Sequence, residues 1–509
     1  MRSKLFYENI LRPLVACFAV TNYQQRARRN GTPPELNTVV QKPAPFFCHS
    51  KVPRDVLNTA KRIAYVFMLL FQACRVDTAA AATENMTLEA ALAATYLSNP
   101  QLEAQRAALR ATDEEVAKAL GGWRPNIGAN GSYGWQQQSQ TLLGPQNVTS
   151  VPQSEQLTIS QPIFDGRTIP TVSHAKELVS AGREELRATE ETVLLNAVSA
   201  YFAVLRDVQI VDAYHEDIDH LRAILKNTDA RLKIGDLTKT DASQATARLL
   251  GSQISLAAAQ QQLTSSRAAF EHAVGRPAET LAEHEPPSLP VDEDKALAMA
   301  LDQNPTLDQR KAEARAADQN VSIAVGALLP SLSVHAQYGR SIDEIAPGVS
   351  QNGVTVLGQL TIPLYQGGAE EASVRQATEQ SSQALLASYD AERQVREDMK
   401  NAWEALRTSR TAADLSLKQA AANSTAYLGT TVESQVGSRN IIDILNAEQE
   451  LLQSKITAIT QRENSLAAAY RVLGVMGQMT ALYLKLPAPV YDPAKHYDQD
   501  ATRWFGFGD

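Results

Sequence analysis

The stretch Gln156-Leu-Thr-Ile-Ser-Gln-Pro-Ile163 alternates polar and apolar side chains, with Gln161 as the one exception. A second stretch, Val354-Thr-Val-Leu-Gly-Gln-Leu-Thr-Ile-Pro-Leu364, largely alternates as well, and its proline lies 201 residues after the first one. Since successive side chains of a β-strand point to opposite faces, both stretches predict strands with one apolar face. Residues 126–135 and 332–338 show the same pattern. We therefore expect four strands, none of which carries Lys, Arg, Asp or Glu.

The chain is an internal duplication. Asn99-Pro100 recurs as Asn304-Pro305, 205 residues later, and Gly235 recurs as Gly437 at a shift of 202. A repeat of this length indicates that each copy holds the same elements in the same order. We assign residues 1–82 to an N-terminal extension with a signal peptide, 83–290 to the first repeat, 291–486 to the second repeat and 487–509 to a C-terminal tail.

Long helices are expected after each strand pair. No proline occurs between Pro170 and Pro277 or between Pro363 and Pro487, and each stretch has a glycine with polar neighbours near its centre. Apolar residues recur every seven positions at Ala197, Val204, Val211, Ile218, Leu225 and Leu232. Such a seam needs a partner helix, and the central glycine suits a turn between the two helices. Each repeat should contain an antiparallel helical hairpin, with first helices on the order of 100 Å long at 1.5 Å per residue.

The composition argues against several classes of protein. Charged residues are 20% of the 509-residue chain and the net charge is -8, whereas nucleic-acid-binding proteins are usually basic. The three cysteines, at positions 17, 48 and 74, all lie near the N-terminus, and His215 and His220 have no further ligand at a metal-binding spacing. A solvated helix face explains these two histidines better. With no Gly-x-Ser-x-Gly motif and no phosphate-binding loop, we expect no enzyme, no metal, no cofactor and no nucleic-acid partner.

The N-terminal segment 1–82 has the features of a targeting sequence. Basic residues between Lys51 and Arg62 precede an apolar run from Ile63 to Phe71, and small residues follow at 79–82. This order is typical of a Sec-type secretory signal. Cys74 lacks the usual context of a lipid-attachment cysteine. After the signal no apolar run is long enough to cross a bilayer as a helix, so we expect no transmembrane helix.

Two kinds of structure are compatible with the four strands: a soluble β-sandwich and a membrane β-barrel. In a soluble sandwich their apolar faces would be buried against another sheet, but the rest of the chain is mostly helical. In a membrane they would form part of a β-barrel, with hairpin loops at about 138–154 and 341–352. Lipid does not tolerate open sheet edges, and bacterial barrels have at least about 8 strands, so other copies must complete the barrel. Two copies would supply 8 strands and three would supply 12, and the strand number does not choose between them.

The sequence resembles the TolC family of bacterial outer-membrane efflux proteins from about Thr87 to the C-terminus. The resemblance rests on the paired Asn-Pro dipeptides, on the segments 161–166 (QPIFDG) and 361–368 (TIPLYQGG), and on the turn segments 235–241 and 437–443. The tail, with Tyr491-Asp-Pro493 and Trp504-Phe-Gly506, is similar to that of the branch that serves type I protein secretion and drug efflux.

The resemblance implies a mixed α+β membrane protein that is a homotrimer. Each chain would give four strands to one 12-stranded outer-membrane barrel and two helical hairpins to a long periplasmic tunnel. Short helices near Leu88–Ser98 and Lys295–Gln303 would form a belt around the tunnel. The channel would meet a periplasmic adaptor and an inner-membrane ABC or proton-driven transporter, and would export proteins or small toxic compounds. The alternative is that the chain is itself a periplasmic adaptor of such a pump.

The resemblance also implies where the functional residues lie. The periplasmic gate is expected at Thr240, Asp241, Arg439 and Asp443. An Arg-to-carboxylate contact would be a directional latch, although Asp241 and Asp443 also suit plain helix capping. Contacts with the adaptor are expected at the helix tips, at Lys233, Gly235, Gln435 and Gly437. Aromatic residues expected at the interface with outer-membrane lipid are Tyr133, Trp135, Phe164, Tyr338 and Tyr365.

Overall fold

The computed structural model describes residues 85–140 and 146–506. The chain divides into two units, Met1–Ala81 and Ala82–Asp509, and all the described residues belong to the second unit. The expected signal peptide lies outside the described residues.

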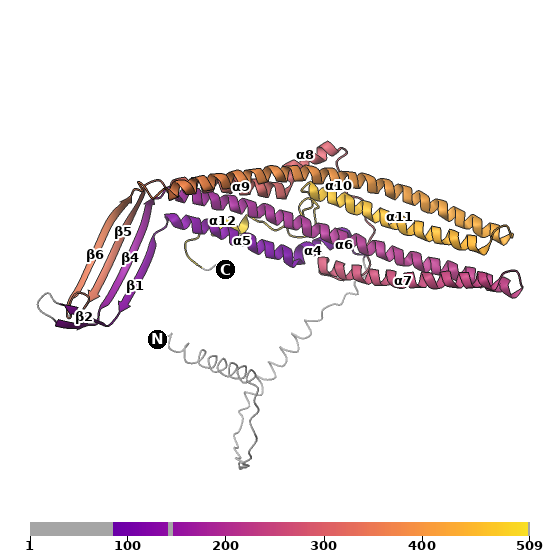
Figure 1. Ribbon diagram of the computed structural model, residues 1–509, viewed down its shortest axis with the longest axis horizontal. Coiled ribbons are helices and arrows are strands. Elements are labelled where there is room, and N and C mark those ends of the chain that lie inside the picture. The colour runs from indigo at the N-terminus through magenta and orange to yellow at the C-terminus, as the bar shows by residue number, and fades with distance from the viewer. Residues whose placement is uncertain (1–84, 141–145, 507–509) are drawn as a thin grey trace, which may run out of the picture. The chain divides into compact units, whose positions relative to one another are not determined.

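A four-stranded antiparallel sheet is formed by strands from both repeats (Figure 1). The strands β1 (Asn126–Tyr133), β4 (Gln153–Phe164), β5 (Ser331–Ile342) and β6 (Ser350–Thr361) pair in the order β1-β4-β5-β6. The pairing places Ile127 opposite Ile159, Ile159 opposite Ala336, and Ala336 opposite Val356. Because the register matches apolar positions to each other, the apolar side chains of all four strands share one face. The four predicted strands and their single apolar face are confirmed.

The strand bounds differ from the prediction in three ways. First, β4 and β5 are longer than expected and include charged residues: Glu155 and Arg340 are paired in the ladder, with Arg340 Nη1 4.0 Å from Glu155 Oε2. Second, β6 ends at Thr361, before Pro363, which has no N–H to donate to a ladder. Third, part of the expected loop at 138–154 is a separate hairpin of β2 (Gln136–Gln140) and β3 (Gln146–Ser150).

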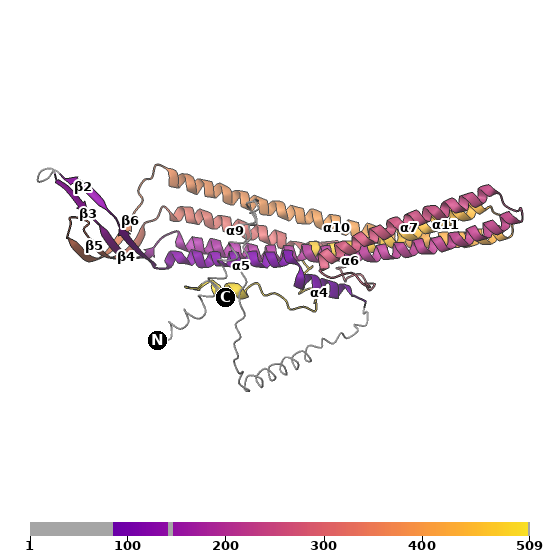
Figure 2. The ribbon, with the colours of Figure 1, turned by 90° about the horizontal axis from the view of Figure 1, so that it is seen from below.

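Two long helical hairpins follow the strand pairs, as predicted. In the first repeat α6 (Thr168–Lys233) is followed by α7 (Lys239–Val274), and in the second α10 (Ala369–Gln435) is followed by α11 (Ile441–Val475). The second helix of each hairpin lies beside the first, in both views (Figures 1 and 2). By length and composition alone α6 contains an 18-residue window apolar enough to cross a membrane, contrary to our expectation, but 44% of that window is buried inside the protein. Core helices also pass this test, so the result is weak evidence for a span.

The two hairpin turns have the same hydrogen-bonded geometry. Gly235 and Gly437 have φ angles of 87° and 81°, a left-handed conformation that favours glycine. In the first turn the N–H of Asp236 donates to the carbonyl of Arg231, at 3.0 Å, and in the second the N–H of Ser438 donates to that of Glu433, also at 3.0 Å. The glycine turns predicted from sequence are therefore confirmed as helix C-caps.

The paired Asn-Pro dipeptides begin equivalent helices. Asn99 is the N-cap of α5 (Pro100–Leu120), and Asn304 is the N-cap of α9 (Pro305–Gly326). Proline at the first helical position costs nothing, since its missing N–H would have no partner there. Each asparagine also donates its side-chain amide to the end of the neighbouring hairpin, Asn99 to Ala273 O at 3.4 Å and Asn304 to Val475 O at 3.0 Å. The dipeptide thus joins each short helix to its repeat's hairpin.

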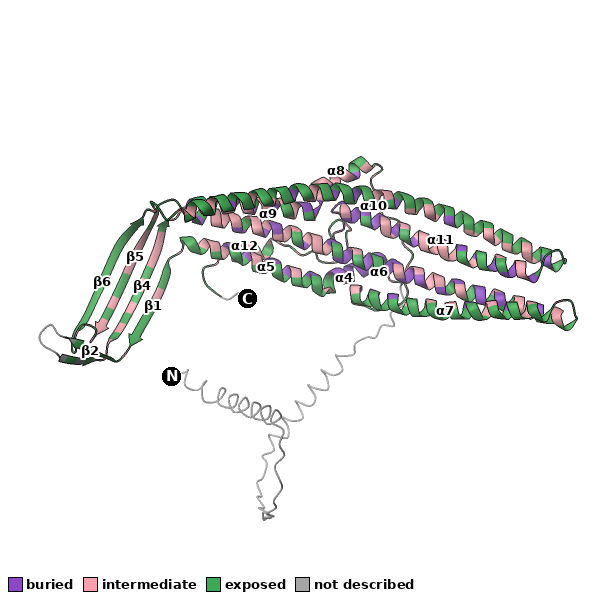
Figure 3. Ribbon diagram, viewed as in Figure 1, coloured by how far each residue is buried: buried purple, intermediate pink, exposed green. Residues whose placement is uncertain are grey.

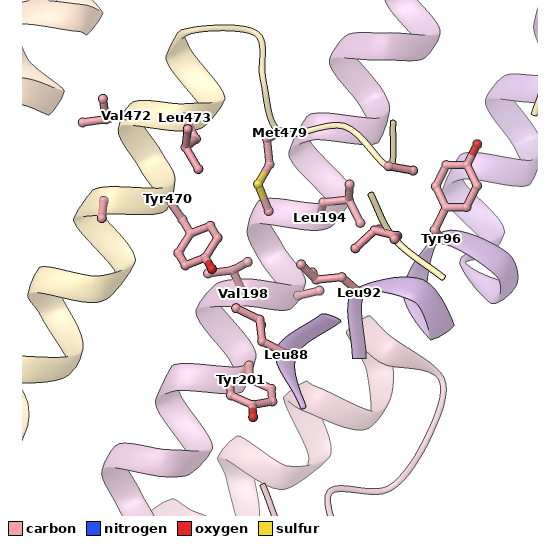
Figure 4. Close-up of a cluster of buried hydrophobic side chains, with 14 of the residues drawn as sticks. Leu88, Leu92, Tyr96, Leu194, Val198, Tyr201, Tyr470, Val472, Leu473 and Met479 are labelled. Atoms are coloured by element: carbon pink, nitrogen blue, oxygen red, sulfur yellow. The ribbon is translucent and has the colours of Figure 1, made fainter. Parts of the chain in front are cut away.

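The main hydrophobic core lies midway along the helices. It joins α4 (Leu88–Ser98) to α6, α11 and the segment after α11, and α8 (Glu293–Gln303) contributes to it as well. Leu92, Leu194 and Met479 meet at its centre (Figure 4). The strands, in contrast, are largely exposed or half-buried (Figure 3). The short helices expected near 88–98 and 295–303 are both present.

Candidate functional site

One face of the sheet is apolar and exposed. The exposed fraction is 65% for Ile127, 67% for Val356 and 60% for Leu360. Water-soluble proteins rarely leave a contiguous apolar surface of this kind uncovered. The soluble-sandwich alternative requires this face to be buried, which it is not in the described chain.

The opposite face is polar and carries no charge over its central part. Gln156 and Thr158 of β4 lie on this face, paired with Gly339 and Gln337 of β5. Across the β1–β4 pair, Thr158 Oγ1 donates to Gly128 O at 3.3 Å, and the hydroxyls of Ser132 and Ser154 lie 2.7 Å apart. Near the ends farthest from the helices, a hollow of about 360 Å³ is lined mainly by polar residues of β4, β5 and β6. Such a surface suits contact with water.

The five aromatic residues expected at a lipid interface lie at different heights of the sheet. Phe164 ends β4 beside the helices and Tyr365 follows β6, whereas Tyr133 ends β1 and Trp135 follows it at the far end. Tyr338 lies on β5, paired with Leu157 and Val354. All five are exposed. Their role at a membrane surface stays a prediction.

The residues expected to contact an adaptor lie at the two hairpin turns. Lys233 and Gln435 are the last residues of α6 and α10, and Gly235 and Gly437 follow two residues later. The residue between each pair is apolar and strongly exposed: Ile234 at 81% and Val436 at 78%. Each tip therefore presents one apolar side chain beside polar neighbours.

Among the expected gate residues, Asp241 has a capping role. Its carboxylate accepts from the Thr238 N–H at 2.9 Å and from the Thr238 hydroxyl at 2.8 Å, which is a capping box at the start of α7. These donors, the backbone N–H first, hold the pKa of Asp241 below its usual value. Thr240 is the second residue of the same helix. At the other tip the Asp443 carboxylate accepts from the Asn440 N–H at 3.3 Å.

Arg439 makes its ion pair within its own hairpin. Its Nε lies 3.0 Å from Glu433 Oε2. The first hairpin has a similar pair, Arg231 with Asp236, at 2.7 Å. The single chain thus shows Asp241 and Asp443 as caps and Arg439 paired with Glu433, and a latch between Arg439 and Asp241 stays a prediction.

A polar cluster between the two hairpins was missed by the sequence analysis. His220 of α6 lies 2.8 Å from Glu448 of α11, and its ring stacks on Tyr427 of α10 at 5.6 Å between centroids. Ser252 of α7 donates to the buried Asp217 of α6 at 2.5 Å. Burial raises the pKa of both Glu448 and Asp217, and hydrogen bonds oppose this effect. His220 is therefore half-buried between the hairpins rather than on a fully solvated face as expected, because Glu448, 228 residues away, packs against it.

A second link between the hairpins lies nearer the tips. The guanidinium of Arg248 on α7 donates to Gln449 and to Asn446, the latter at 3.3 Å. Arg248 carried no signal in the sequence, because both of its partners belong to the other repeat. These contacts hold α7 and α11 together in the half of the hairpins that bears the turns.

Together the fold and these surfaces are those of a membrane channel protein: a sheet with one lipid-compatible face, continued by two helical hairpins with exposed tips. The chain belongs to the family described as "Outer membrane efflux protein", whose profile matches residues 91–276 and 296–478.

Curated relatives agree with this assignment. The chain is 31% identical to the outer membrane efflux protein BepC of Brucella suis over 456 residues, which cover 86% of this chain and 98% of the relative. It is 23% identical to the outer membrane protein TolC of Escherichia coli, over 75% of this chain and 80% of TolC. The alkaline protease secretion protein AprF of Pseudomonas aeruginosa is 24% identical, over 68% of this chain and 75% of AprF.

Solved structures share the fold. The outer membrane channel CmeC of Campylobacter jejuni superposes with a TM-score of 0.70 at 15% identity, over 81% of this chain and 89% of that one. The outer membrane protein VceC of Vibrio cholerae gives 0.66 at 17% identity, over 77% and 96%. The chain is therefore an outer-membrane export channel protein, its relatives are channels rather than enzymes, and the adaptor alternative is not favoured.

Proposed function

We propose that three copies of this chain form one closed 12-stranded barrel in the outer membrane, continued by a periplasmic tunnel of helical hairpins. The observation that carries this proposal is the exposed apolar face of a sheet whose outer strands, β1 and β6, have open edges. In lipid, unpaired backbone groups find no water, so the edges must be paired. Pairing β6 of one copy with β1 of the next continues the antiparallel alternation and closes the sheet. Four strands per chain then give 12 in a trimer.

The two faces of the sheet have different roles in this assembly. The apolar face, with Ile127, Val356 and Leu360, contacts lipid, and the aromatic residues at either end lie near the headgroups. The uncharged polar face lines a water-filled lumen. The N-terminal signal directs the chain through the inner membrane and is removed. The cargo is a protein or a small toxic compound, in keeping with relatives named for efflux and for alkaline protease secretion.

The tips of the hairpins close the tunnel at rest and dock the pump. Exposed Ile234 and Val436, with Lys233, Gly235, Gln435 and Gly437 around them, offer an apolar contact to a periplasmic adaptor. An inner-membrane ABC or proton-driven transporter supplies the energy. Thr240, Asp241, Arg439 and Asp443 form polar links between neighbouring tips. Solvated links contribute only about 0 to 1 kcal/mol each, so a docking partner that favours the open state by a few kcal/mol opens the gate.

Disulfide trapping tests the closure of the barrel. The three natural cysteines lie at positions 17, 48 and 74, so none of them is in the sheet. A disulfide formed between engineered cysteines in the strands is therefore not confused with one from a natural strand cysteine. Ala129→Cys on β1 is combined in turn with cysteine at Val354, Val356 and Gly358 on β6, because the register between copies is open. We expect one of these pairs to give covalent dimers and trimers on oxidation in the outer membrane. Each single-cysteine variant is the control. Monomers from every pair would contradict the closed trimer.

A further inference from the structure

The C-terminal segment packs on α5 through a small core and a set of polar contacts. Ala501 is buried with Val116, Ala175 and Val179. The guanidinium of Arg124, in the segment between α5 and β1, donates to Arg503 O at 2.8 Å. These contacts place the short helix α12 (Lys495–Asp500) along α5, although the two helices come from opposite ends of the described chain.

At this junction the imidazole of His496 has carboxylates at both nitrogens. Nδ1 lies 3.1 Å from Asp113 Oδ2. Nε2 lies 3.3 Å from Asp500 Oδ2 and 3.9 Å from Glu114 Oε1. His496 and Asp500 are four residues apart and share one face of α12, and Asp113 and Glu114 are consecutive on α5.

Asp113 fixes the orientation of the ring. Its side chain is 1% exposed, and its second oxygen has no hydrogen-bond partner among the described residues. A buried carboxylate that accepts from Nδ1–H leaves the lone pair of neutral imidazole on Nε2, and this arrangement of a carboxylate behind a histidine is typical of metal ligands. The Nε2 lone pair then faces two further carboxylate oxygens, and either a proton or a metal ion between them removes the repulsion.

The geometry points to a divalent transition-metal site, of the zinc class, formed by His496 Nε2, Asp500 Oδ2 and Glu114 Oε1. These three atoms lie within 4.8 Å of one another. In a tetrahedral zinc site with bonds of about 2.0–2.1 Å, ligand atoms are separated by roughly 3.3 Å. The distance from His496 Nε2 to Asp500 Oδ2 has this value already. Glu114 Oε1 lies 3.9 Å from Nε2, and its exposed side chain can move to close the difference. One imidazole with two carboxylates suits zinc better than magnesium or calcium, which prefer all-oxygen sites.

The cations around the site leave its ligand atoms free. Arg503 Nε is 2.8 Å from Asp500 Oδ1, the oxygen that does not face His496. Arg183 of α6 stacks over the Tyr497 ring, with 5.2 Å between Cζ and the centroid, and lies on the Asp113 side. Metal binding at Nε2 requires a neutral imidazole ring. A bound ion would join the C-terminal segment to α5.

Zinc binding to the full-length protein tests the site. The protein is purified in detergent with a tag that contains no histidine, and zinc uptake at pH 7.5 is measured by equilibrium dialysis with elemental analysis. We expect one saturable zinc ion per chain, which excess magnesium does not displace. His496→Ala and Asp500→Asn should each lower the affinity at least about 100-fold, and Asp113→Asn, which changes only the orienting group, by about 10- to 100-fold.

The matched control is His215→Ala, which removes an exposed histidine of α6 away from this cluster and should leave zinc binding unchanged. Each variant is first checked for an unchanged elution volume and helix content. If His496→Ala alone fails this check, Asp500→Asn and Glu114→Gln decide the question. Wild-type affinity in Asp500→Asn and Glu114→Gln, or no saturable zinc binding by the unaltered protein, would overturn the proposal.

Discussion

Arg439 has one observed partner and one proposed partner, and single substitutions separate them. Glu433 pairs with it inside the hairpin, whereas Asp241 belongs to the other tip. If Arg439 latches the gate, Arg439→Ala and Asp241→Asn should both raise single-channel conductance in planar bilayers. A link of about 1 kcal/mol changes the open-to-closed ratio about fivefold. Asparagine can still accept from the Thr238 N–H, so the cap of α7 is kept while the charge is removed.

Glu433→Gln is the control for this experiment. If Arg439 acts only within its own hairpin, Glu433→Gln should reproduce the conductance of Arg439→Ala, and Asp241→Asn should behave like the unaltered channel. This result would contradict a latch between Arg439 and Asp241 and would show that Asp241 acts only as a helix cap.

Burial of the Glu191 carboxyl group should make the free energy of unfolding depend on pH in an unusual direction. Glu191 lies in α6, 6% exposed, beside a cavity of about 730 Å³, and burial raises its pKa to about 9. Between the ordinary value of 4.5 and about 9 the folded state binds a proton that the unfolded state does not. This group's contribution to the stability therefore falls as pH rises, by up to about 1.4 kcal/mol per pH unit.

Glu191→Gln should therefore raise the apparent Tm of the detergent-purified protein at pH 7.5, and the gain should shrink as pH falls toward 4.5. Thermal unfolding followed by circular dichroism measures it. Glu185→Gln, at a more exposed position of the same helix, should change little at either pH. A gain that is independent of pH would show that the substitution acts through packing or hydrogen bonding of the side chain, and not through the charge of Glu191.

Strand β6 offers neighbouring residues on opposite faces of the sheet. Val356 lies on the apolar face and Thr355 on the polar face, and both are exposed in the single chain. A lysine on the lipid face of a barrel costs about 2–4 kcal/mol near the membrane centre, whereas a lumen position tolerates it. Val356→Lys should thus reduce the amount of trimer in the outer membrane severalfold, and Thr355→Lys should leave that amount near normal while reducing cation conductance. The amounts are compared on gels of membrane fractions without boiling. Equal losses in both variants would contradict the assignment of the faces.

The elements themselves differed in how well the sequence predicted them. The period of two predicted β4 and β6, and the absence of proline with a central glycine predicted both hairpins. The hairpin of β2 and β3 was missed, because Gln136–Gln140 is polar at every position and has no alternation to detect. Strands β4 and β5 extend beyond the predicted segments to Glu155 and Arg340, which lie paired near the far ends, where an aqueous boundary can solvate them.

For the assembled protein, the proposed barrel predicts a specific extraction behaviour. A barrel that spans the lipid buries its apolar face, so washes with high salt or alkaline carbonate should leave the protein in the membrane pellet, and only detergent should release it. The detergent-extracted protein should have the mass of three chains by light scattering. Release by salt alone would contradict a spanning sheet and would reopen the adaptor alternative.

The sequence determined the features that depend on neighbouring residues: strand periodicity, helix ends at Asn99 and Asn304, and the turns at Gly235 and Gly437. Such features follow from backbone sterics and from hydrogen bonds over a few residues, so a local pattern encodes them. The pairing of distant side chains was set by the fold alone. His220 meets Glu448 across 228 residues, and His496 meets Asp113 across 383 residues. No local pattern marks such contacts, because the register of packed helices brings these residues together.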